Sequence, residues 1–240
     1  SGYIDKSYQI TQWYPKPAVY DQRGWHEMPY LDQGEFYSEF GNYEVQITVP
    51  KKYIVASTGF LQEEKKDSTT KTLRYQQNDV HDFAWFADAG YEVKHDTLQL
   101  ASKIIDVYAY YHTKSAATWK NSIAFIKSAI KTKSEWLGEY PYKTVSVVES
   151  RDNADGGMEY PTITLISSPS SERMLDYVIN HEVGHNWFYG ILASNEREHP
   201  WMDEGMNSYY DNRYSLQQYN NSSLELFKTG TAFIDKRLPD

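Results

Sequence analysis

The segment His181-Glu182-Val183-Gly184-His185 holds two imidazoles four positions apart. An α-helix advances 3.6 residues per turn, so residues four apart share one face, with β-carbons roughly 5–6 Å from each other. In a helix, His181 and His185 can therefore offer two nitrogens to one metal ion. Glu182 would lie roughly 100° around the helix from His181, close enough to act on a water molecule held by that metal. The pattern H-E-x-x-H thus indicates metal-dependent hydrolysis.

A third donor follows at Glu204, nineteen residues after His185, within Trp201-Met202-Asp203-Glu204-Gly205-Met206. Two histidines and one glutamate make a catalytic zinc set that leaves the fourth position to water. Residues 195–200 are polar and end in a proline, so we expect a loop that returns Glu204 to the histidine pair. This donor favours a metal site over the alternative reading, in which a helix merely buries two core histidines.

The elements that must hold these residues change character along the chain. Residues 35–93 show a β pattern, with apolar and polar residues alternating between 43 and 49. Residues 104–111 predict another strand. Apolar residues then recur at spacings of four, three and four, as in an amphipathic helix: Trp119, Ile123, Ile126 and Ile130. The catalytic pattern therefore follows a β-rich part and a first helix.

The segments nearest to the metal motif alternate between strand and helix. Residues 145–148 and 162–166 are short apolar runs that predict strands. Ser170-Ser171-Glu172 supplies the side chains that begin a helix, and this helix would carry the two histidines. Residues 203 to about 219 predict the second helix, which would carry Glu204.

Composition narrows the function classes. The 240 residues carry 24 Lys and Arg against 33 Asp and Glu, a net charge of −9, which argues against nucleic acid as a partner. No apolar run approaches the roughly eighteen residues that a transmembrane helix needs. The absence of cysteine excludes disulfides and thiolate zinc ligands, so histidine, aspartate and glutamate are left to bind a metal.

A further motif lies upstream, at Gly156-Gly157-Met158-Glu159-Tyr160-Pro161. Together, the three motifs resemble the M1 family of zinc aminopeptidases within the gluzincins, whose members carry G-x-M-E-N, then H-E-x-x-H, then W-x-x-E-G. The similarity runs from about residue 144 to 214, and a looser similarity extends back through residues 37–41 and 49–50.

The resemblance implies an α+β fold with a β-sandwich-like N-terminal part followed by the upper half of a thermolysin-like catalytic domain. Residues 1–97 would be the C-terminal part of an M1-type N-terminal β domain. Residues 98–240 would be the zinc catalytic domain, incomplete at its C-terminus. We therefore expect an internal fragment of a longer enzyme, with flanking segments of the same polypeptide missing.

The resemblance also assigns roles to single residues. One zinc ion would be bound by His181, His185 and Glu204. Glu182 would take a proton from the zinc-bound water and pass it to the leaving amine. Glu159, with Gly157 and Met158 beside it, would bind the free α-ammonium group of a peptide substrate. The protein is then expected to be an aminopeptidase, and the alternatives are a gluzincin endopeptidase or a non-catalytic zinc-containing binding module.

The sequence departs from the family pattern in three places. Tyr160 replaces the motif asparagine, and Tyr14 falls where members often carry a Gln or Glu of the amine pocket; we interpret Tyr14 as structural. The family's transition-state tyrosine is expected beyond the chain, because none of four tyrosines matches its distance from the last ligand: Tyr209, Tyr210, Tyr214 and Tyr219. For localisation, we expect the cell envelope or secretion rather than the cytoplasm.

Overall fold

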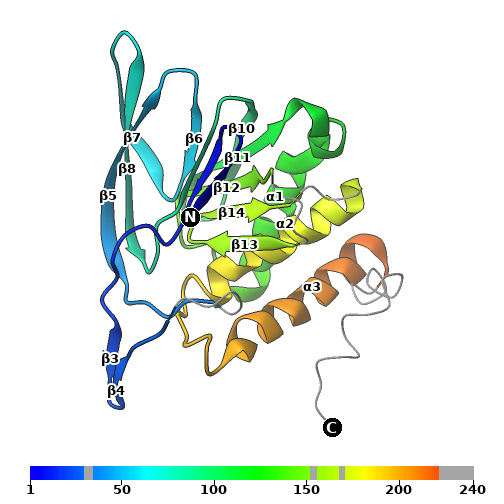
Figure 1. Ribbon diagram of the computed structural model, residues 1–240. Coiled ribbons are helices and arrows are strands. Elements are labelled where there is room, and N and C mark those ends of the chain that lie inside the picture. The colour runs from blue at the N-terminus through cyan, green and yellow to red at the C-terminus, as the bar shows by residue number, and fades with distance from the viewer. Residues whose placement is uncertain (30–34, 152–155, 168–170, 222–240) are drawn as a thin grey trace.

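The computed structural model describes residues 1–29, 35–151, 156–167 and 171–221 (Figure 1). Strands fill the N-terminal half and the described α-helices lie in the C-terminal half. The strands are β1 (Gly2–Ile4), β2 (Ser7–Ile10), β3 (Val19–Asp21), β4 (Gly24–His26), β5 (Gly41–Pro50), β6 (Ile54–Ser57), β7 (Phe60–Lys66), β8 (Thr70–Val80), β9 (Trp85–Asp88), β10 (Tyr91–Gln99), β11 (Ile104–His112), β12 (Thr144–Glu149), β13 (Gly157–Tyr160) and β14 (Ile163–Ile166). The helices are α1 (Ser122–Leu137), α2 (Glu172–Phe188) and α3 (Glu204–Tyr219), with 3₁₀ turns at η1 (Thr113–Ser115), η2 (Thr118–Asn121) and η3 (Pro200–Met202).

The N-terminal part is a pair of antiparallel sheets packed face to face. One sheet has the strand order β5-β8-β7 and the other β1-β2-β9-β6, while β3 and β4 form a separate hairpin. The apolar residues that alternate along β5 point inward: Ile47 and Val49 are buried with Leu73 of β8 and Val55 of β6. This packing produces the β-sandwich-like part that the resemblance implies.

The C-terminal part is built on a mixed sheet with the strand order β10-β11-β12-β14-β13. Strands β11, β12 and β14 run parallel, and the edge strands β10 and β13 are antiparallel to their neighbours. All six residues of β12 are buried, as expected of a central strand covered on both faces. In Figure 1, α1 and α2 lie across one face of this sheet and α3 lies beyond α2.

Local sequence explains where the helices begin and end. The Ser171 side chain accepts a hydrogen bond from the Met174 backbone N–H and so caps α2. The predicted apolar spacing places Trp119, Ile126 and Ile130 in one core with Leu175, Ile179 and Val183 of α2. Helix α1 ends before Gly138, whose φ of 109° suits glycine. The predicted α+β class and the three predicted helices are confirmed.

The structure adds detail at the predicted boundary near residue 97. That position lies inside β10, which pairs along its whole length with β11, so the second sheet already begins at Tyr91. The division into domains at 97 stays a prediction. None of the helices in the described residues is both long and apolar enough to cross a membrane.

Candidate active site

Three predicted metal donors converge between α2 and the first turn of α3. His181, His185 and Glu204 each offer a ligand atom, and these atoms all lie within 4.8 Å of one another. The two Nε2 atoms are 3.2 Å apart, and Glu204 Oε2 lies 3.6 Å from Nε2 of His181 and 3.9 Å from Nε2 of His185. The loop at residues 189–203 returns the chain as the polar sequence predicted, so the donors meet across the two helices.

Two buried aspartates fix how the imidazoles are turned. The Nδ1 atom of His181 lies 2.6 Å from Asp211 Oδ2, and the Nδ1 atom of His185 lies 2.6 Å from Asp203 Oδ1. Each histidine thus donates its Nδ1–H to a carboxylate and directs Nε2 toward Glu204. This arrangement is typical of metal-binding histidines, since the second partner fixes the tautomer and the ring orientation.

The sequence analysis missed both aspartates, although one signal was available. Asp211 stands seven residues after Glu204, so the two share a face of α3 after two turns. Asp203 is adjacent to Glu204 and gives no such signal. Both side chains are fully buried.

A tightly packed layer lies behind the histidines. A β-carbon built on Gly184 would come within 2.1 Å of Asn207 Oδ1 and 2.6 Å of Lys133 Cε. Asn207 in turn donates from Nδ2 to the His181 backbone oxygen at 2.8 Å. Glycine at the fourth position of the motif therefore lets α1 and α3 approach the metal-binding helix closely. The sequence analysis also missed Lys133, which is fully buried.

Glu182 lies where a proton acceptor can work beside the metal donors. It is buried, and the Thr164 hydroxyl donates to its Oε2 at 3.2 Å. Burial, opposed by the charge of His181 and aided by that of Glu204, raises the pKa of Glu182 to about 8. A carboxylate with so high a pKa is a stronger base than one in water. Its position on the side facing β13 is fixed by backbone, because a β-carbon on Gly157 would lie 2.2 Å from Glu182 Oε1.

Glu159 of β13 closes the other side of the site. Its carboxyl group is buried, and ligand atoms of Glu159, Glu182 and His185 all lie within 4.8 Å of one another. Among the described residues, nothing donates a hydrogen bond to Glu159 Oε1, while His185 Nδ1 lies 3.8 Å away. Burial and the nearby charges of Glu35 and Glu182 raise the pKa of Glu159 well above its usual value. The site therefore presents a buried acceptor that a cation could satisfy.

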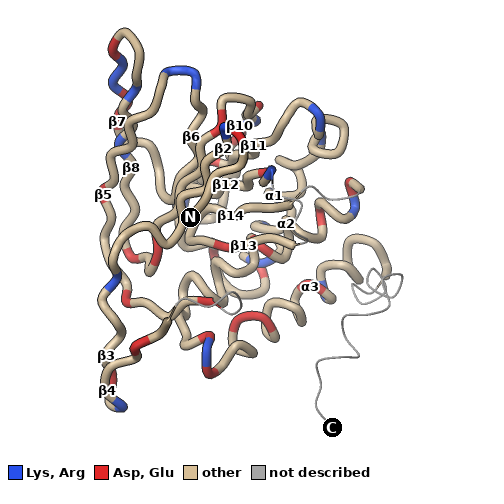
Figure 2. Tube along the Cα trace, viewed as in Figure 1, with Lys and Arg blue, Asp and Glu red and all other residues tan. Residues whose placement is uncertain are grey.

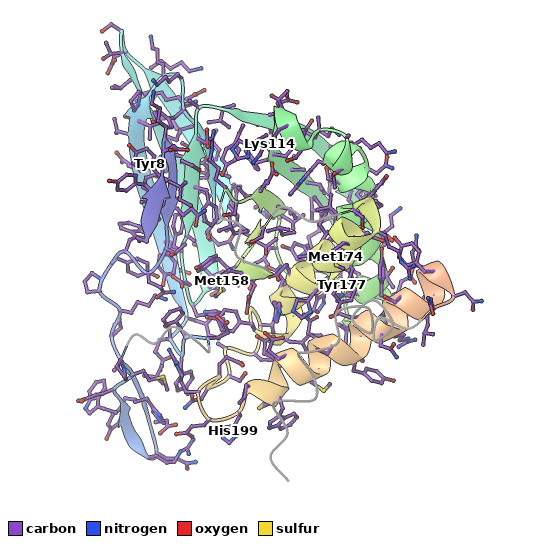
Figure 3. The ribbon with its side chains drawn as sticks, turned by 45° about the vertical axis from the view of Figure 1, so that its right-hand side comes forward. Tyr8, Lys114, Met158, Met174, Tyr177 and His199 are labelled. Atoms are coloured by element: carbon purple, nitrogen blue, oxygen red, sulfur yellow. The ribbon has the colours of Figure 1, made fainter. Side chains whose placement is uncertain are left out.

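The hairpin that carries Glu159 is tied directly to α2. Asn186, the residue after His185, accepts a hydrogen bond from the Thr162 backbone N–H at 3.0 Å. Thr162 has a φ of 67° and forms the turn between β13 and β14. Figure 3 labels Met158 on β13 and Tyr177 on α2. The Tyr177 ring lies nearly parallel to the His181 ring, and their centroids are 6.4 Å apart. This connection fixes Glu159 relative to the metal donors.

Two further acidic residues reach the site, and the sequence analysis missed them. Burial, followed by the charges of Glu204, Asp203 and Glu196, raises the pKa of Glu35 to about 7. Burial also raises the pKa of Glu196 to about 7. Each has one buried carboxyl oxygen that accepts no hydrogen bond from the described residues. Figure 2 shows acidic residues in red on β13 and on the first turn of α3. The site as a whole is strongly acidic.

The donor set fits a divalent metal ion. Two imidazole nitrogens 3.2 Å apart need a hydrogen atom between them, because two lone pairs repel. Burial lowers the pKa of His181, but the charge of Asp211 and its hydrogen bond outweigh burial and raise this pKa to about 9. Burial and the charge of His181 lower the pKa of His185 to about 3. The two Nε2 atoms therefore face one point, at which a metal cation could contact both. Two imidazoles and one carboxylate in this arrangement match the ligand preference of zinc.

The tyrosines named from the sequence lie elsewhere. The Tyr14 hydroxyl hydrogen-bonds to Tyr43 at 3.0 Å and to Asp82 at 3.1 Å, and its ring packs against the sandwich core, as a structural role requires. Tyr160 is buried where the sandwich meets the second sheet. Tyr214 and Tyr219 both donate to Asp176, while Tyr209 is 64% exposed. None of these contacts reaches the metal donors.

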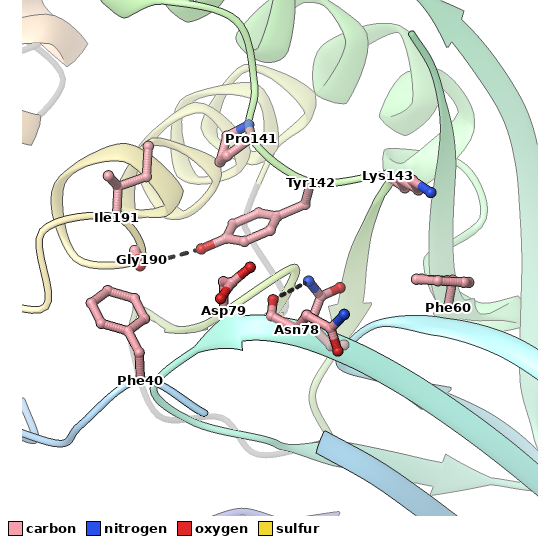
Figure 4. A pocket seen from close by; sticks show the side chains of 10 residues that line it. Phe40, Phe60, Asn78, Asp79, Pro141, Tyr142, Lys143, Gly190 and Ile191 are labelled. Atoms are coloured by element: carbon pink, nitrogen blue, oxygen red, sulfur yellow. Dashed lines mark hydrogen bonds between the residues drawn. The ribbon is translucent and has the colours of Figure 1, made fainter. Parts of the chain in front are cut away.

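A separate cavity of about 460 Å³ lies behind the C-terminal end of α2 (Figure 4). Tyr142, Asp79, Phe40 and Phe60 line it, and the Tyr142 hydroxyl donates to the Gly190 backbone oxygen at 3.2 Å. Because the metal donors do not line this cavity, it is not part of the site described above.

Comparison with known proteins shows which family part of the chain resembles. Residues 122–234 match the Peptidase family M1 domain. The chain is thus similar to peptidase family M1 over these residues. Over 63 residues it is 36% identical to leucine aminopeptidase 2 of Aspergillus oryzae, which is 25% of this chain and 10% of that protein.

Solved structures of M1 zinc metallopeptidases share the fold. The structure of one from Deinococcus radiodurans has a TM-score of 0.65 and 20% identity, covering 85% of this chain and 47% of that one. A variant bound to a Tyr-Ser-Ala substrate, from the same organism, has a TM-score of 0.62 and 19% identity, covering 77% of this chain and 43% of that one. The present chain therefore spans less than half the length of these M1 structures.

Proposed function

We propose that the protein is a zinc-dependent aminopeptidase, which removes the N-terminal residue of peptides by attack of water on the first peptide bond. Zinc would be held by Nε2 of His181, Nε2 of His185 and the carboxylate of Glu204. The match of residues 122–234 to the Peptidase family M1 domain and the similarity to a leucine aminopeptidase over part of the chain support this proposal.

One observation carries the amino-terminal specificity: the buried Glu159 carboxylate lies beside the metal donors. In a peptide, the α-nitrogen is about 2.5 Å from the carbonyl carbon of the same residue, given the two bonds that join them. A substrate whose first carbonyl lies at the metal must therefore place its α-ammonium within a few ångströms of the donors. The ligand atoms of Glu159, Glu182 and His185 lie within 4.8 Å of one another, which suits this spacing.

The surrounding charge favours the same end of a peptide. The carboxyl groups of Glu35 and Glu196 lie close enough to Asp203 and Glu204 to perturb one another's pKa values. Every unblocked peptide carries an α-ammonium group at neutral pH, whatever its side chains are. A strongly acidic pocket next to the metal therefore favours a free amino terminus over an internal peptide bond.

Zinc would supply a Lewis acid for the carbonyl oxygen and lower the pKa of the attacking water. Glu182 would take a proton from that water at its carboxylate and pass it to the leaving amine. Thr164 holds one oxygen of Glu182 by its 3.2 Å hydrogen bond, so the other oxygen is directed to the site. Asp203 and Asp211 would keep both histidines in the tautomer that presents Nε2.

The test compares free and N-acetylated forms of one peptide series. Glu159→Ala should lower kcat/KM on free peptides, because a buried carboxylate–ammonium pair is broken on one side. The expected loss of transition-state stabilisation is about 2–5 kcal/mol. Hydrolysis of acetylated peptides, already poor, should change little. Glu63→Ala, on the exposed face of β7, is the matched control and should leave both rates unchanged.

Two outcomes would contradict the proposal. Equal cleavage of acetylated and free peptides by the unmodified protein would favour an endopeptidase. Stoichiometric zinc without hydrolysis of any peptide would favour a zinc-containing binding module.

A further inference from the structure

A buried lysine lies behind the metal-binding helix. Lys133 of α1 is fully buried, and its Nζ donates to the backbone oxygen and to Oδ1 of Asn180, each at 2.8 Å. Asn180 directly precedes His181. Lysine is rarely buried to this extent, since removing its ammonium group from water is costly unless partners compensate. The position therefore needs an explanation beyond core packing.

The contacts of Lys133 lead to the ligand His181 through Asn180 and Asp211. Asn180 Nδ2 donates to Asp211 Oδ1 at 2.7 Å, and the other oxygen of Asp211 accepts from His181 Nδ1 at 2.6 Å. Lys133 Nζ itself lies 3.7 Å from Asp211 Oδ1. The ammonium group thus orients the Asn180 amide and also faces the carboxylate that turns the histidine.

Lys133 also compensates the negative charge of Asp211. Asp211 is fully buried, and an unpaired carboxylate in such a place is strongly unfavourable. Among the described residues, Lys133 is the lysine or arginine that forms an ion pair with Asp211. With that charge present, Asp211 can remain an acceptor for the His181 Nδ1–H, and His181 keeps Nε2 for a metal.

We propose that Lys133 is a positioning residue of the zinc site, which acts on His181 through Asn180 and Asp211. This inference rests on the zinc site of the proposed function. It states that a residue on α1, which touches neither metal nor substrate, sets the affinity and the geometry of metal binding. A purely structural lysine would instead contribute to stability and leave metal binding by the folded protein unchanged.

The experiment measures metal binding rather than turnover. Lys133→Met replaces the ammonium group with an apolar side chain of similar length. Zinc affinity is measured by competition with a chelator, and the visible absorption of the Co²⁺-loaded protein reports the ligand geometry. We expect the folded variant to bind zinc about 10- to 100-fold more weakly, as for other partners of metal ligands, and to show an altered cobalt spectrum. Lys127→Met, on the same helix but in an ion pair with Asp96 outside the core, should match the unmodified protein in both measurements.

A double-mutant cycle tests the route. If Lys133 acts through Asp211, then Asp211→Asn alone and Lys133→Met with Asp211→Asn should have equal zinc affinities. The double variant removes both buried charges together, so this comparison remains available even if Lys133→Met alone fails to fold.

The outcomes separate this inference from the proposed function. Unchanged zinc affinity and an unchanged cobalt spectrum in folded Lys133→Met would overturn the positioning role, as would independent losses that multiply in the double variant. Failure of the unmodified protein to bind zinc would instead overturn the zinc site itself.

Discussion

Two buried clusters pair histidine with carboxylates, and they differ in what the second ring nitrogen of each histidine faces. At the junction of β9, β11 and β12, His112 Nδ1 lies 3.1 Å from Glu149 and its Nε2 lies 3.1 Å from Asp88. Both nitrogens are thus bound to acidic partners. At the candidate metal site, His181 and His185 give only Nδ1 to aspartates, and both Nε2 atoms face Glu204.

The difference teaches how to distinguish a structural histidine from a ligand. Hydrogen bonds to Glu149 raise the pKa of His112, and burial opposes this effect. Since both of its ring nitrogens face carboxylates, His112 connects the acidic side chains of two strands, and Arg151 also donates to Asp88. A metal needs a free lone pair, which this cluster lacks. Burial and a carboxylate partner are common to both clusters. What separates them is that the Nε2 atoms of His181 and His185 face each other and Glu204, where one metal ion can contact all three.

The largest expected contrast lies in turnover. Glu182→Gln should keep zinc but lower kcat by about 10²- to 10⁴-fold, since the proton acceptor is lost. Glu149→Gln in the other cluster should leave kcat unchanged and lower the free energy of unfolding by about 1.5–3 kcal/mol, because a charged hydrogen bond is weakened. Steady-state kinetics, zinc content and denaturant unfolding of both variants check this; near-normal kcat in Glu182→Gln would exclude Glu182 as the base.

A smaller contrast is expected in metal affinity. Asp203→Asn removes the charged acceptor of His185 Nδ1–H, and zinc affinity should fall about 10- to 100-fold. Asp88→Asn makes the same change beside His112 and should leave zinc affinity unchanged. Chelator competition on both proteins measures the effect. Equal affinities in the two variants would show that Asp203 does not prepare its histidine for a metal.

The smallest effect is a pH dependence of stability. The pKa of His112 is raised in the folded protein above its unfolded value of about 6.5, so its contribution is fully present below that pH. The contribution is lost as the pH rises through the folded pKa. The difference in unfolding free energy between the unmodified protein and His112→Asn should therefore be constant at acidic pH and shrink at alkaline pH. Urea unfolding across that range measures it, and a difference that grows with pH would contradict a raised pKa of His112.

Much of the fold was predictable because periodicity reports burial directly. The spacing of Trp119, Ile123, Ile126 and Ile130 predicted α1, and the Ser171 cap predicted the start of α2. The H-E-x-x-H pattern and Glu204 were named from spacing alone, and their convergence supports the ligand assignment, which stays a prediction. The expectations on localisation and on missing flanking segments also stay predictions.

The rest depended on contacts between elements far apart in sequence. Glu35 comes from a stretch without regular structure, and no local pattern shows that it meets Glu204. Lys133 carried a signal that could have been used: it stands three residues after Ile130, where the α1 spacing calls for an apolar residue. A charge at such a position indicates a buried partner. That the partner is Asp211 follows only from the packing of three helices.

The two glycines beside the site determine how it can vary. A side chain at Gly157 would collide with Glu182, and one at Gly184 would collide with Asn207 and Lys133. Substitutions at these positions would displace the catalytic carboxylate or the helix behind the ligands without removing any reactive group. Attempts to redesign the substrate preference of this protein therefore have little freedom along the backbone next to the metal. Changes in preference must therefore come from side chains rather than from these two backbone positions.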